Sequence, residues 1–277
     1  EISACLVGSE MCIRDRVDSV LRARANECAP FENVYTLALR GLHDRAMNAS
    51  NNMSDRKQML QDALMAQRKM LIDATGKRGE DIPQAFTPYK EVLDVYDEGL
   101  ELPDDVTIIW PDDNYGYMKR LSSPKEQKRS GRSGVYYHSS YLGKPHDHLW
   151  MNTTSPTLMY EELRKAYDLT ADRIWLLNAG DIKSCEFAVD YFLTMAFDID
   201  SFNFERAANY RTEWLCGMLG NDYRNEYQDV INSFYKLAFA RKPEFMGWGY
   251  QWATDKHGRE RNTDTDFSLA NYREVDT

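Results

Sequence analysis

Short runs of apolar residues alternate along this chain with segments of helical periodicity, and this alternation constrains the fold more than any other feature. The strand-like runs are VYTLAL (34–39), IPQAFTPYKE (82–91), VTIIW (106–110), GVYYHSSY (134–141) and RIWLLN (173–178). Such near-continuous apolar runs are typical of parallel strands buried on both faces. The sequence therefore predicts an α/β fold with a parallel sheet covered by helices.

Helix signals lie between these runs. Ser54 is expected to cap one helix, which ends near Gly76, and Ser155 with Pro156 supplies the cap and first position of another. Ser184 is expected to cap a third. Five strands are too few for a complete (β/α)8 barrel of about 250 residues. We therefore predict the later part of such a barrel over residues 17–200.

The pattern changes after residue 200, where strand-like runs stop and helical periodicity continues to Pro243. This change predicts that residues 201–277 are the start of a helical domain with a polar tail. Residues 1–16, EISACLVGSEMCIRDR, show neither helical nor strand period and closely resemble a translated sequencing-library adapter. We interpret them as a non-native segment, as in a metagenomic fragment, and exclude them from the fold argument.

Charge and composition exclude several classes of protein. The chain carries 34 basic and 44 acidic side chains, a net charge of −10, which argues against nucleic-acid binding. No stretch approaches the roughly 20 apolar residues of a membrane span. The five cysteines are irregularly spaced, so neither a disulfide framework nor a zinc site is predicted. His146 and His148 flank Asp147, but no third ligand is spaced nearby, so no metal or other cofactor is expected.

Polar and acidic residues follow the strand-like runs, where parallel α/β folds place their chemistry. They are Asp44, Glu91, Asp112, Asp113, His138 and Asp181. Converging carboxylates raise one another's pKa, so one holds a proton while another stays ionised. Hydrolysis of a glycosidic bond requires such a pair. Nearby tyrosines, such as Tyr115 and Tyr141, suit stacking on a sugar face.

Each of these residues also has a structural explanation. Asp181 is placed to cap the following helix, and one of Asp112 and Asp113 is placed to hold the turn after its strand. His138 fits a core histidine with satisfied hydrogen bonds, and Glu91 fits a surface ion pair with Lys90. From spacing alone, many reactions remain open.

Several longer strings carry a resemblance to a known family. They are RGLHD (40–44), PQAFTPYKEV (83–92), WPDDNYGY (110–117), SGVYYHSSYLGKPHDHLW (133–150), NTTSP (152–156), RIWLLNAGDIK (173–183) and RKPE (241–244). In this order they resemble glycoside hydrolase family 115, the family of the xylan α-1,2-glucuronidases. The resemblance implies an α/β domain, a (β/α)8 catalytic barrel, a helical bundle and a β-domain, of which this chain holds only part.

The resemblance also implies an activity. It predicts an inverting hydrolase that removes α-1,2-linked glucuronic acid, or its 4-O-methyl ether, from glucuronoxylan or its oligosaccharides. The parent protein is expected to be a periplasmic or extracellular homodimer without a cofactor. This chain is expected to be an incomplete fragment, inactive alone. A non-catalytic carbohydrate-binding relative, or a barrel hydrolase acting on another uronide, is the alternative.

Site residues follow from the matching motifs. They are Arg40 and Asp44 in RGLHD, Glu91 in YKEV, Asp112 and Asn114 in WPDDN, and His138 and Tyr141 in YYHSSY. The resemblance implies Glu91 as general acid and Asp44 or Asp112 as the group that orients or deprotonates water. Arg40 is expected to pair with the uronate carboxylate, and Asn114, His138 and Tyr141 are expected to hold sugar hydroxyls.

Two positions depart from the family's usual pattern. Arg132 stands where a glycine is common, and Ser184 stands where a proline is common. Both lie in expected loops, so they bear on local geometry rather than on the chemistry.

Overall fold

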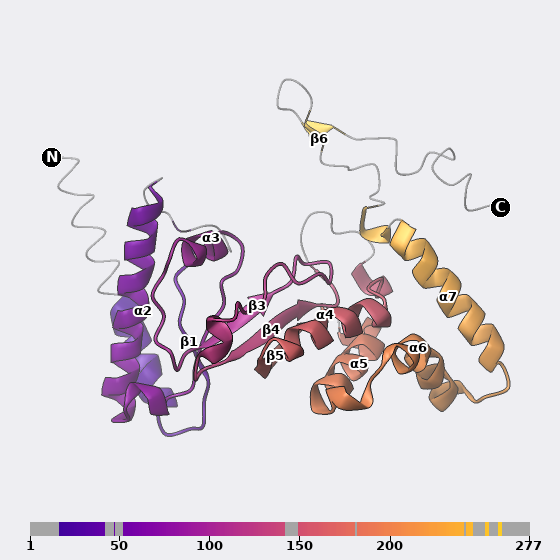
Figure 1. The fold of residues 1–277 in the computed structure, drawn as a ribbon, viewed down its shortest axis with the longest axis horizontal. Coiled ribbons are helices and arrows are strands. Elements are labelled where there is room, and N and C mark those ends of the chain that lie inside the picture. The colour runs from indigo at the N-terminus through magenta and orange to yellow at the C-terminus, as the bar shows by residue number, and fades with distance from the viewer. Residues whose placement is uncertain are drawn as a thin grey trace. The chain divides into compact units, whose positions relative to one another are not determined.

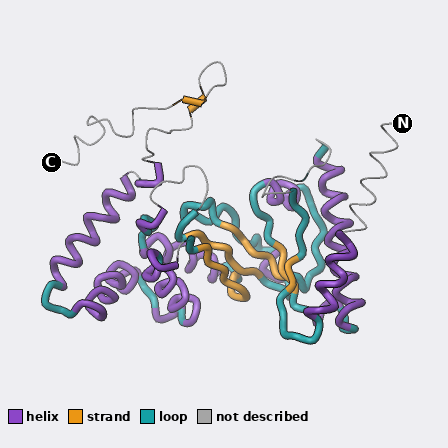
Figure 2. The backbone as a smooth tube through the Cα atoms, turned by 180° about the vertical axis from the view of Figure 1, so that it is seen from behind, coloured by secondary structure: helices purple, strands orange, loops and turns teal. Residues whose placement is uncertain are grey.

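The computed structural model describes residues 17–41, 47, 52–141, 149–180, 182–240, 242–245, 253–254 and 260–261. Figure 1 shows their fold as a ribbon, and Figure 2 shows the same elements from behind. The chain divides into two compact units, each described by itself. The first unit comprises Glu1–Trp110 and Ser122–Gly134, and the second comprises Pro111–Leu121 and Val135–Thr277.

The main sheet has five strands in the order β1-β2-β3-β4-β5, which is also their order in the chain. β1 pairs with β2, and β2 with β3, in parallel. The strands are β1 (Tyr35–Thr36), β2 (Gln84–Phe86), β3 (Thr107–Pro111), β4 (Ser133–His138) and β5 (Ala171–Asn178). Successive βα units of a barrel produce this order, so the sheet is consistent with the predicted partial barrel.

Burial differs between the strands. All five residues of β3 are buried, as the run VTIIW predicts. β5 was expected to be buried as well, but its pattern is mixed, and Leu176 is 45 % exposed. The expectation was wrong because β5 is the last strand of this sheet. In the tail, β6 (Ala253–Thr254) and β7 (Glu260–Arg261) form an antiparallel pair.

Helices precede the sheet, connect several of its strands and follow its last strand. Residues 17–28 are helical. The longer helices that follow are α2 (Met53–Thr75), α3 (Glu91–Asp97), α4 (Pro156–Asp168), α5 (Glu186–Phe197), α6 (Phe204–Leu219) and α7 (Arg224–Ala240). α6 packs against both α4 and α7. Within the described part of the chain, no helix combines the length and apolar character needed to cross a membrane.

Two of the expected helix ends are confirmed. The Ser155 hydroxyl accepts a hydrogen bond from the Leu158 amide at 3.2 Å, with Pro156 at the first helical position. α2 ends at Gly76, which adopts a left-handed conformation with φ of 66°. Serine before proline and glycine after the last turn were therefore reliable signals here.

Two expected caps are wrong. The cap of α2 is Asn52, whose side chain accepts from the Ser54 amide at 3.0 Å. Asparagine and serine are nearly equal as caps, so the choice between them depends on where the incoming backbone turns. Ser184 lies in a 3₁₀ turn, and α5 begins after Cys185 without a side-chain cap. A residue already in a helical turn lacks the extended backbone that capping requires.

Two arginines secure the loop that leads into β3 in the first unit. Arg68 of α2 makes two hydrogen bonds of 2.8 and 2.9 Å to the Asp105 carboxylate. Arg129 donates to the backbone carbonyls of Leu102, Pro103 and Val106. Planar guanidinium groups suit both tasks because they present several donors in a fixed geometry.

The core of the second unit is rich in aromatic rings. Tyr191 is fully buried, lies 5.4 Å from the Phe202 ring in an edge contact, and donates to the Pro156 carbonyl at 2.8 Å. Burial raises the pKa of Tyr191. Tyr137 stacks on Phe192 with centroids 6.3 Å apart. These contacts join β4, α4 and α5 into one packed layer.

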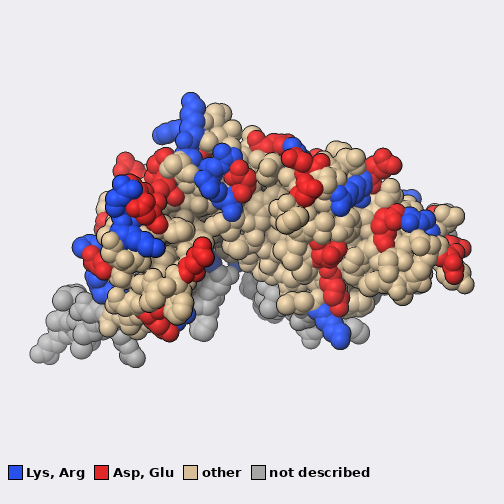
Figure 3. All heavy atoms as spheres, turned by 90° about the horizontal axis from the view of Figure 1, so that it is seen from below, with Lys and Arg blue, Asp and Glu red and all other residues tan. Residues whose placement is uncertain are grey.

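Charged side chains of both signs share the surface. On the face drawn in Figure 3, basic and acidic side chains lie beside one another rather than in separate patches. Such mixing differs from the basic surfaces with which proteins neutralise phosphate backbones.

Arg132 adopts the left-handed conformation, with φ of 52°, at the position where the family pattern has glycine. A non-glycine residue in this conformation destabilises the folded state by about 1–2 kcal/mol. Glycine avoids this strain, but it loses more backbone freedom on folding, which offsets about 0.5–1 kcal/mol of the gain. We therefore expect Arg132→Gly to raise the free energy of unfolding by roughly 0.5–1 kcal/mol, measured by urea denaturation.

The neighbouring Gly131→Ala variant is the matched control and should act in the opposite direction. A Cβ at Gly131 would lie 2.5 Å from the Val106 carbonyl oxygen, so the backbone would have to shift. A loss of stability in Arg132→Gly would mean that contacts of the arginine side chain outweigh the backbone strain.

Candidate active site

A buried aspartate–histidine pair lies at the ends of β3 and β4 in the second unit. Asp112 directly follows β3, and His138 is the last residue of β4. The His138 Nδ1 and Asp112 Oδ1 atoms are 2.6 Å apart, and the two side chains are 1 % and 0 % exposed. An ionised carboxylate only accepts hydrogen bonds, so Nδ1 is the donor and Nε2 is the second polar atom of the ring.

The Asp112 carboxylate accepts further hydrogen bonds from the backbone. Oδ1 accepts from the Asn114 amide at 3.0 Å. Oδ2 accepts from the His138 amide at 3.0 Å and from the Gly116 amide at 3.2 Å. Four donors therefore surround the carboxylate, and it ties the loop after β3 to the end of β4.

The loop after β3 has an unusual backbone. Asn114 and Gly116 adopt positive φ values of 76° and 97°. A Cβ at Gly116 would lie 2.7 Å from the Tyr137 hydroxyl, which donates to the Gly116 carbonyl at 3.0 Å. Asp113 also holds this turn, since its Oδ1 accepts from the Tyr115 and Tyr117 amides. Strained backbone of this kind clusters at functional sites.

Aromatic rings surround His138. The Tyr136 ring lies 4.5 Å away, and Tyr141 makes an edge contact at 5.5 Å. Tyr141 in turn contacts Tyr115, with centroids 6.2 Å apart. Burial raises the pKa of Tyr115, and the nearby Tyr141 raises it further. The Tyr115 hydroxyl therefore stays protonated and can donate to a ligand.

Asn178 belongs to this group and was missed in the sequence. It is the last residue of β5, and its side-chain amide donates to the Tyr136 hydroxyl at 2.9 Å. Its backbone carbonyl accepts from the Ser139 amide at 3.0 Å. The available signal was its place at the end of RIWLLN, where we instead singled out Asp181 three residues later.

A second group lies in the first unit, where Arg40 meets Glu91. Arg40 follows β1, and Glu91 is the first residue of α3, just after β2. Arg40 Nε and Nη2 each lie 3.2 Å from one oxygen of the Glu91 carboxylate, with the side chains 20 % and 22 % exposed. Glu91 thus has an ion-pair partner 51 residues away in the chain, in addition to the adjacent Lys90 that the sequence suggested.

Tyr89 and Lys90 shape the surroundings of this pair. The Arg40 guanidinium lies 5.4 Å from the centre of the Tyr89 ring, and the Lys90 ammonium lies 5.0 Å from it. Lys90, directly before Glu91, has a positive φ of 51°. Two cations, one carboxylate and one aromatic face thus gather after β1 and β2, which suits recognition of an acidic sugar.

The structure describes every predicted site residue except Asp44. It brings Arg40 to Glu91, and it brings Asp112 to His138, with Tyr141 in contact with the histidine ring. Asn114 is held through its backbone amide. Asp44, Asp181 and the segment from His146 to His148 lie outside the described residues. Within the ranges described, no three His, Cys, Asp or Glu side chains cluster as metal ligands would.

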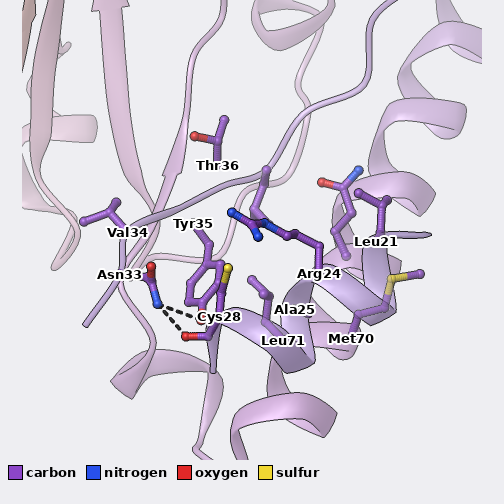
Figure 4. A pocket seen from close by; sticks show the side chains of 12 residues that line it. Leu21, Arg24, Ala25, Cys28, Asn33, Val34, Tyr35, Thr36, Met70 and Leu71 are labelled. Carbon is purple, nitrogen blue, oxygen red and sulfur yellow. Dashed lines mark hydrogen bonds between the residues drawn. The ribbon is translucent and has the colours of Figure 1, made fainter. Parts of the chain in front are cut away.

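A cavity of about 300 Å³ lies elsewhere in the first unit, between the helix of residues 17–28, β1 and α2 (Figure 4). Its lining is mostly apolar, including Ala25, Leu37 and Met70, and Asn33 donates to the Cys28 carbonyl at its edge. The lining runs along β1 from Asn33 to Leu37 and contains no carboxylate side chain. Hydrolysis of a glycosidic bond requires carboxylates, so this cavity is a poor candidate.

Comparisons with known proteins match a part of the chain that includes both of these groups of site residues. The model of glycosyl hydrolase family 115 matches residues 11–245. A solved structure described as a novel family GH115 4-O-methyl-alpha-glucuronidase, BtGH115A, with specificity for decorated arabinogalactans, is 37 % identical, with a TM-score of 0.81. The match covers 94 % of this chain and 35 % of that one, so the chain spans about a third of that protein's length. No curated protein matches the chain.

Proposed function

Because this chain belongs to glycosyl hydrolase family 115, we propose that it is part of a longer hydrolase that releases glucuronic acid, or its 4-O-methyl ether, from a polysaccharide. The observation that carries this proposal is the Arg40–Glu91 pair. An arginine that holds a carboxylate in a two-point contact can do the same for the carboxylate of a uronate.

The pair supports a division of roles. When a uronate occupies the Arg40 guanidinium, the Glu91 carboxyl is released from its two contacts with that arginine. Glu91 then acts as the general acid that protonates the leaving oxygen. Substrate binding and activation of the acid are thereby coupled through one arginine. Tyr89 offers its ring face beside this arginine.

The second unit supplies a different contribution. The Asp112 carboxylate already accepts four hydrogen bonds and is fully buried. We therefore assign Asp112 the role of positioning His138 and the loop that carries Asn114. Asn114 and Tyr141 bind sugar hydroxyls. His138 contributes indirectly, through its contact with the Tyr141 ring. Asp44 is then the group that activates water, which makes the reaction inverting.

Two polysaccharides are candidates for the substrate. The motifs that resemble the xylan α-1,2-glucuronidases favour glucuronoxylan and its oligosaccharides. The similar solved structure is of an enzyme described as specific for decorated arabinogalactans, which favours that class instead. Both present a uronic acid on a neutral chain, so Arg40 alone does not distinguish them.

The test is release of free uronic acid from both polysaccharides by the longer enzyme. We expect release from one of them, and the anomeric proton signals of the first product should show an inverted configuration. Binding of either glycan without any release would favour the alternative of a non-catalytic carbohydrate-binding relative. Release with retained configuration would remove the proposed role of Asp44.

We also propose the wider organisation that the family resemblance implies. The described sheet is the later part of a (β/α)8 barrel, and α6 and α7 begin a helical domain. The parent protein is a homodimer exported to the periplasm or cell exterior, where its polymeric substrate is found. Light scattering of the purified longer protein tests the dimer, and cell fractionation tests its location.

A further inference from the structure

A cavity of about 680 Å³ lies in the second unit between the loop after β3, the start of α4 and the end of α7. None of the site residues discussed so far lines it. It nevertheless adjoins the loop of the aspartate–histidine pair, because its lining includes Tyr117. The Tyr117 amide donates to the Asp113 carboxylate, and the Tyr117 carbonyl accepts from the Asp113 amide at 2.8 Å.

Aromatic side chains form part of its lining and remain accessible. Tyr117 is 43 % exposed, Phe204 is 59 % exposed and Phe239 is 82 % exposed. Large rings at the protein surface are costly unless something covers them. A sugar ring has one apolar face that fits such a ring and hydroxyl groups at its edge.

Hydroxyl groups and one ammonium supply the polar part of the lining. Thr153, Ser155 and Thr157 lie at the start of α4 and line the cavity together with Lys242. The Lys242 ammonium donates to the Thr153 hydroxyl at 3.3 Å and to the Thr154 hydroxyl at 3.5 Å. An ammonium has three donors, so it can serve a ligand hydroxyl as well.

The charges around the cavity select against a charged ligand. Glu161 lines it together with Lys242, so one acidic and one basic group face the same space. The Glu244 carboxylate lies close by and accepts from the Thr153 hydroxyl at 2.5 Å. Burial lowers the pKa of Lys242, and the nearby Glu244 and Asp113 carboxylates act against that shift. A neutral, hydroxyl-rich ligand fits this mixture better than a uronate does.

We propose that this cavity binds neutral sugar units of the polysaccharide chain that carries the uronate. The volume is within the range of cavities that hold ligands of a few rings. The choice of sugar as the ligand rests on the proposed function, whereas its neutral charge rests on the lining residues. Binding there would place neutral sugar units next to the loop that carries Asp112 and Asn114.

The test is a titration of this chain, followed by NMR, with xylotriose and separately with a neutral β-galactotriose. We expect at least one of them to bind, and we expect Phe239→Ala and Lys242→Met each to weaken that binding about tenfold. Phe197→Ala is the matched control, because Phe197 is 93 % exposed and lies outside the cavity lining. The sugar that binds identifies the class of polysaccharide.

A parallel titration with glucuronic acid separates this inference from the proposed function. Arg40→Ala should abolish uronate binding and leave the neutral sugar unaffected. Failure of glucuronic acid to bind would count against the proposed function alone. Absence of neutral sugar binding, or binding that both cavity variants leave unchanged, would overturn the assignment of the cavity.

Discussion

Replacing Asp112 with alanine is expected to lower the free energy of unfolding of this chain by about 3–5 kcal/mol. The change removes a fully buried carboxylate and leaves His138 Nδ1 without its acceptor at 2.6 Å. It also deprives the amides of Asn114, Gly116 and His138 of their shared acceptor. Each buried donor left without a partner costs about 1–3 kcal/mol, so the loss is a large part of a typical domain's stability.

Urea denaturation followed by circular dichroism measures this loss. Asp168→Asn is the matched control, because Asp168 is 52 % exposed and pairs with Arg164 at the surface. Exposed ion pairs contribute about 0–1 kcal/mol, so the control should unfold close to the unchanged chain. A similar small effect of Asp112→Ala would show that the pair does not hold the loop after β3.

Replacing Glu91 with glutamine in the longer enzyme is expected to reduce release of uronic acid by about 10²–10⁴-fold. Glutamine keeps the size of the side chain and a polar contact to Arg40, but it cannot deliver a proton to the leaving oxygen. Binding of the uronate should survive, because Arg40 remains. The loss should therefore fall on kcat rather than on KM.

Glu98→Gln is the control for this change, since Glu98 is exposed at the opposite end of α3. It should release uronic acid at the unchanged rate. A second comparison uses a substrate with an activated leaving group, such as a nitrophenyl glucuronide, which needs no protonation. Glu91→Gln should recover most of its activity on that substrate, and equal loss on both substrates would contradict the role of general acid.

Local sequence patterns predicted the elements well where one signal dominated. The run VTIIW became the buried strand β3, and Ser155 with Pro156 began α4. Prediction failed where two signals competed, as when Asn52 rather than Ser54 capped α2. It also failed for β5, whose apolar residues are partly exposed because the strand ends the described sheet.

The candidate site was also predicted only in part. The sequence predicted its residue types and their positions after strands, because acidic and polar side chains interrupt the apolar runs there. The partner of Glu91 was not readable, since Arg40 lies 51 residues earlier and the adjacent Lys90 offered an equally good charge. The importance of Asn178 was equally hidden, because its contact with Tyr136 spans 42 residues.

The sequence by itself determined the order of strands and helices, the family and the kinds of side chain at the strand ends, because periodicity and motifs are local properties. Only the tertiary structure decided which of these side chains meet. It paired Asp112 with His138 in a buried contact, and it lined a cavity with Tyr117 and Lys242 from distant segments. Hydrogen bonds and burial depend on distances in space, which residue spacing along the chain does not specify.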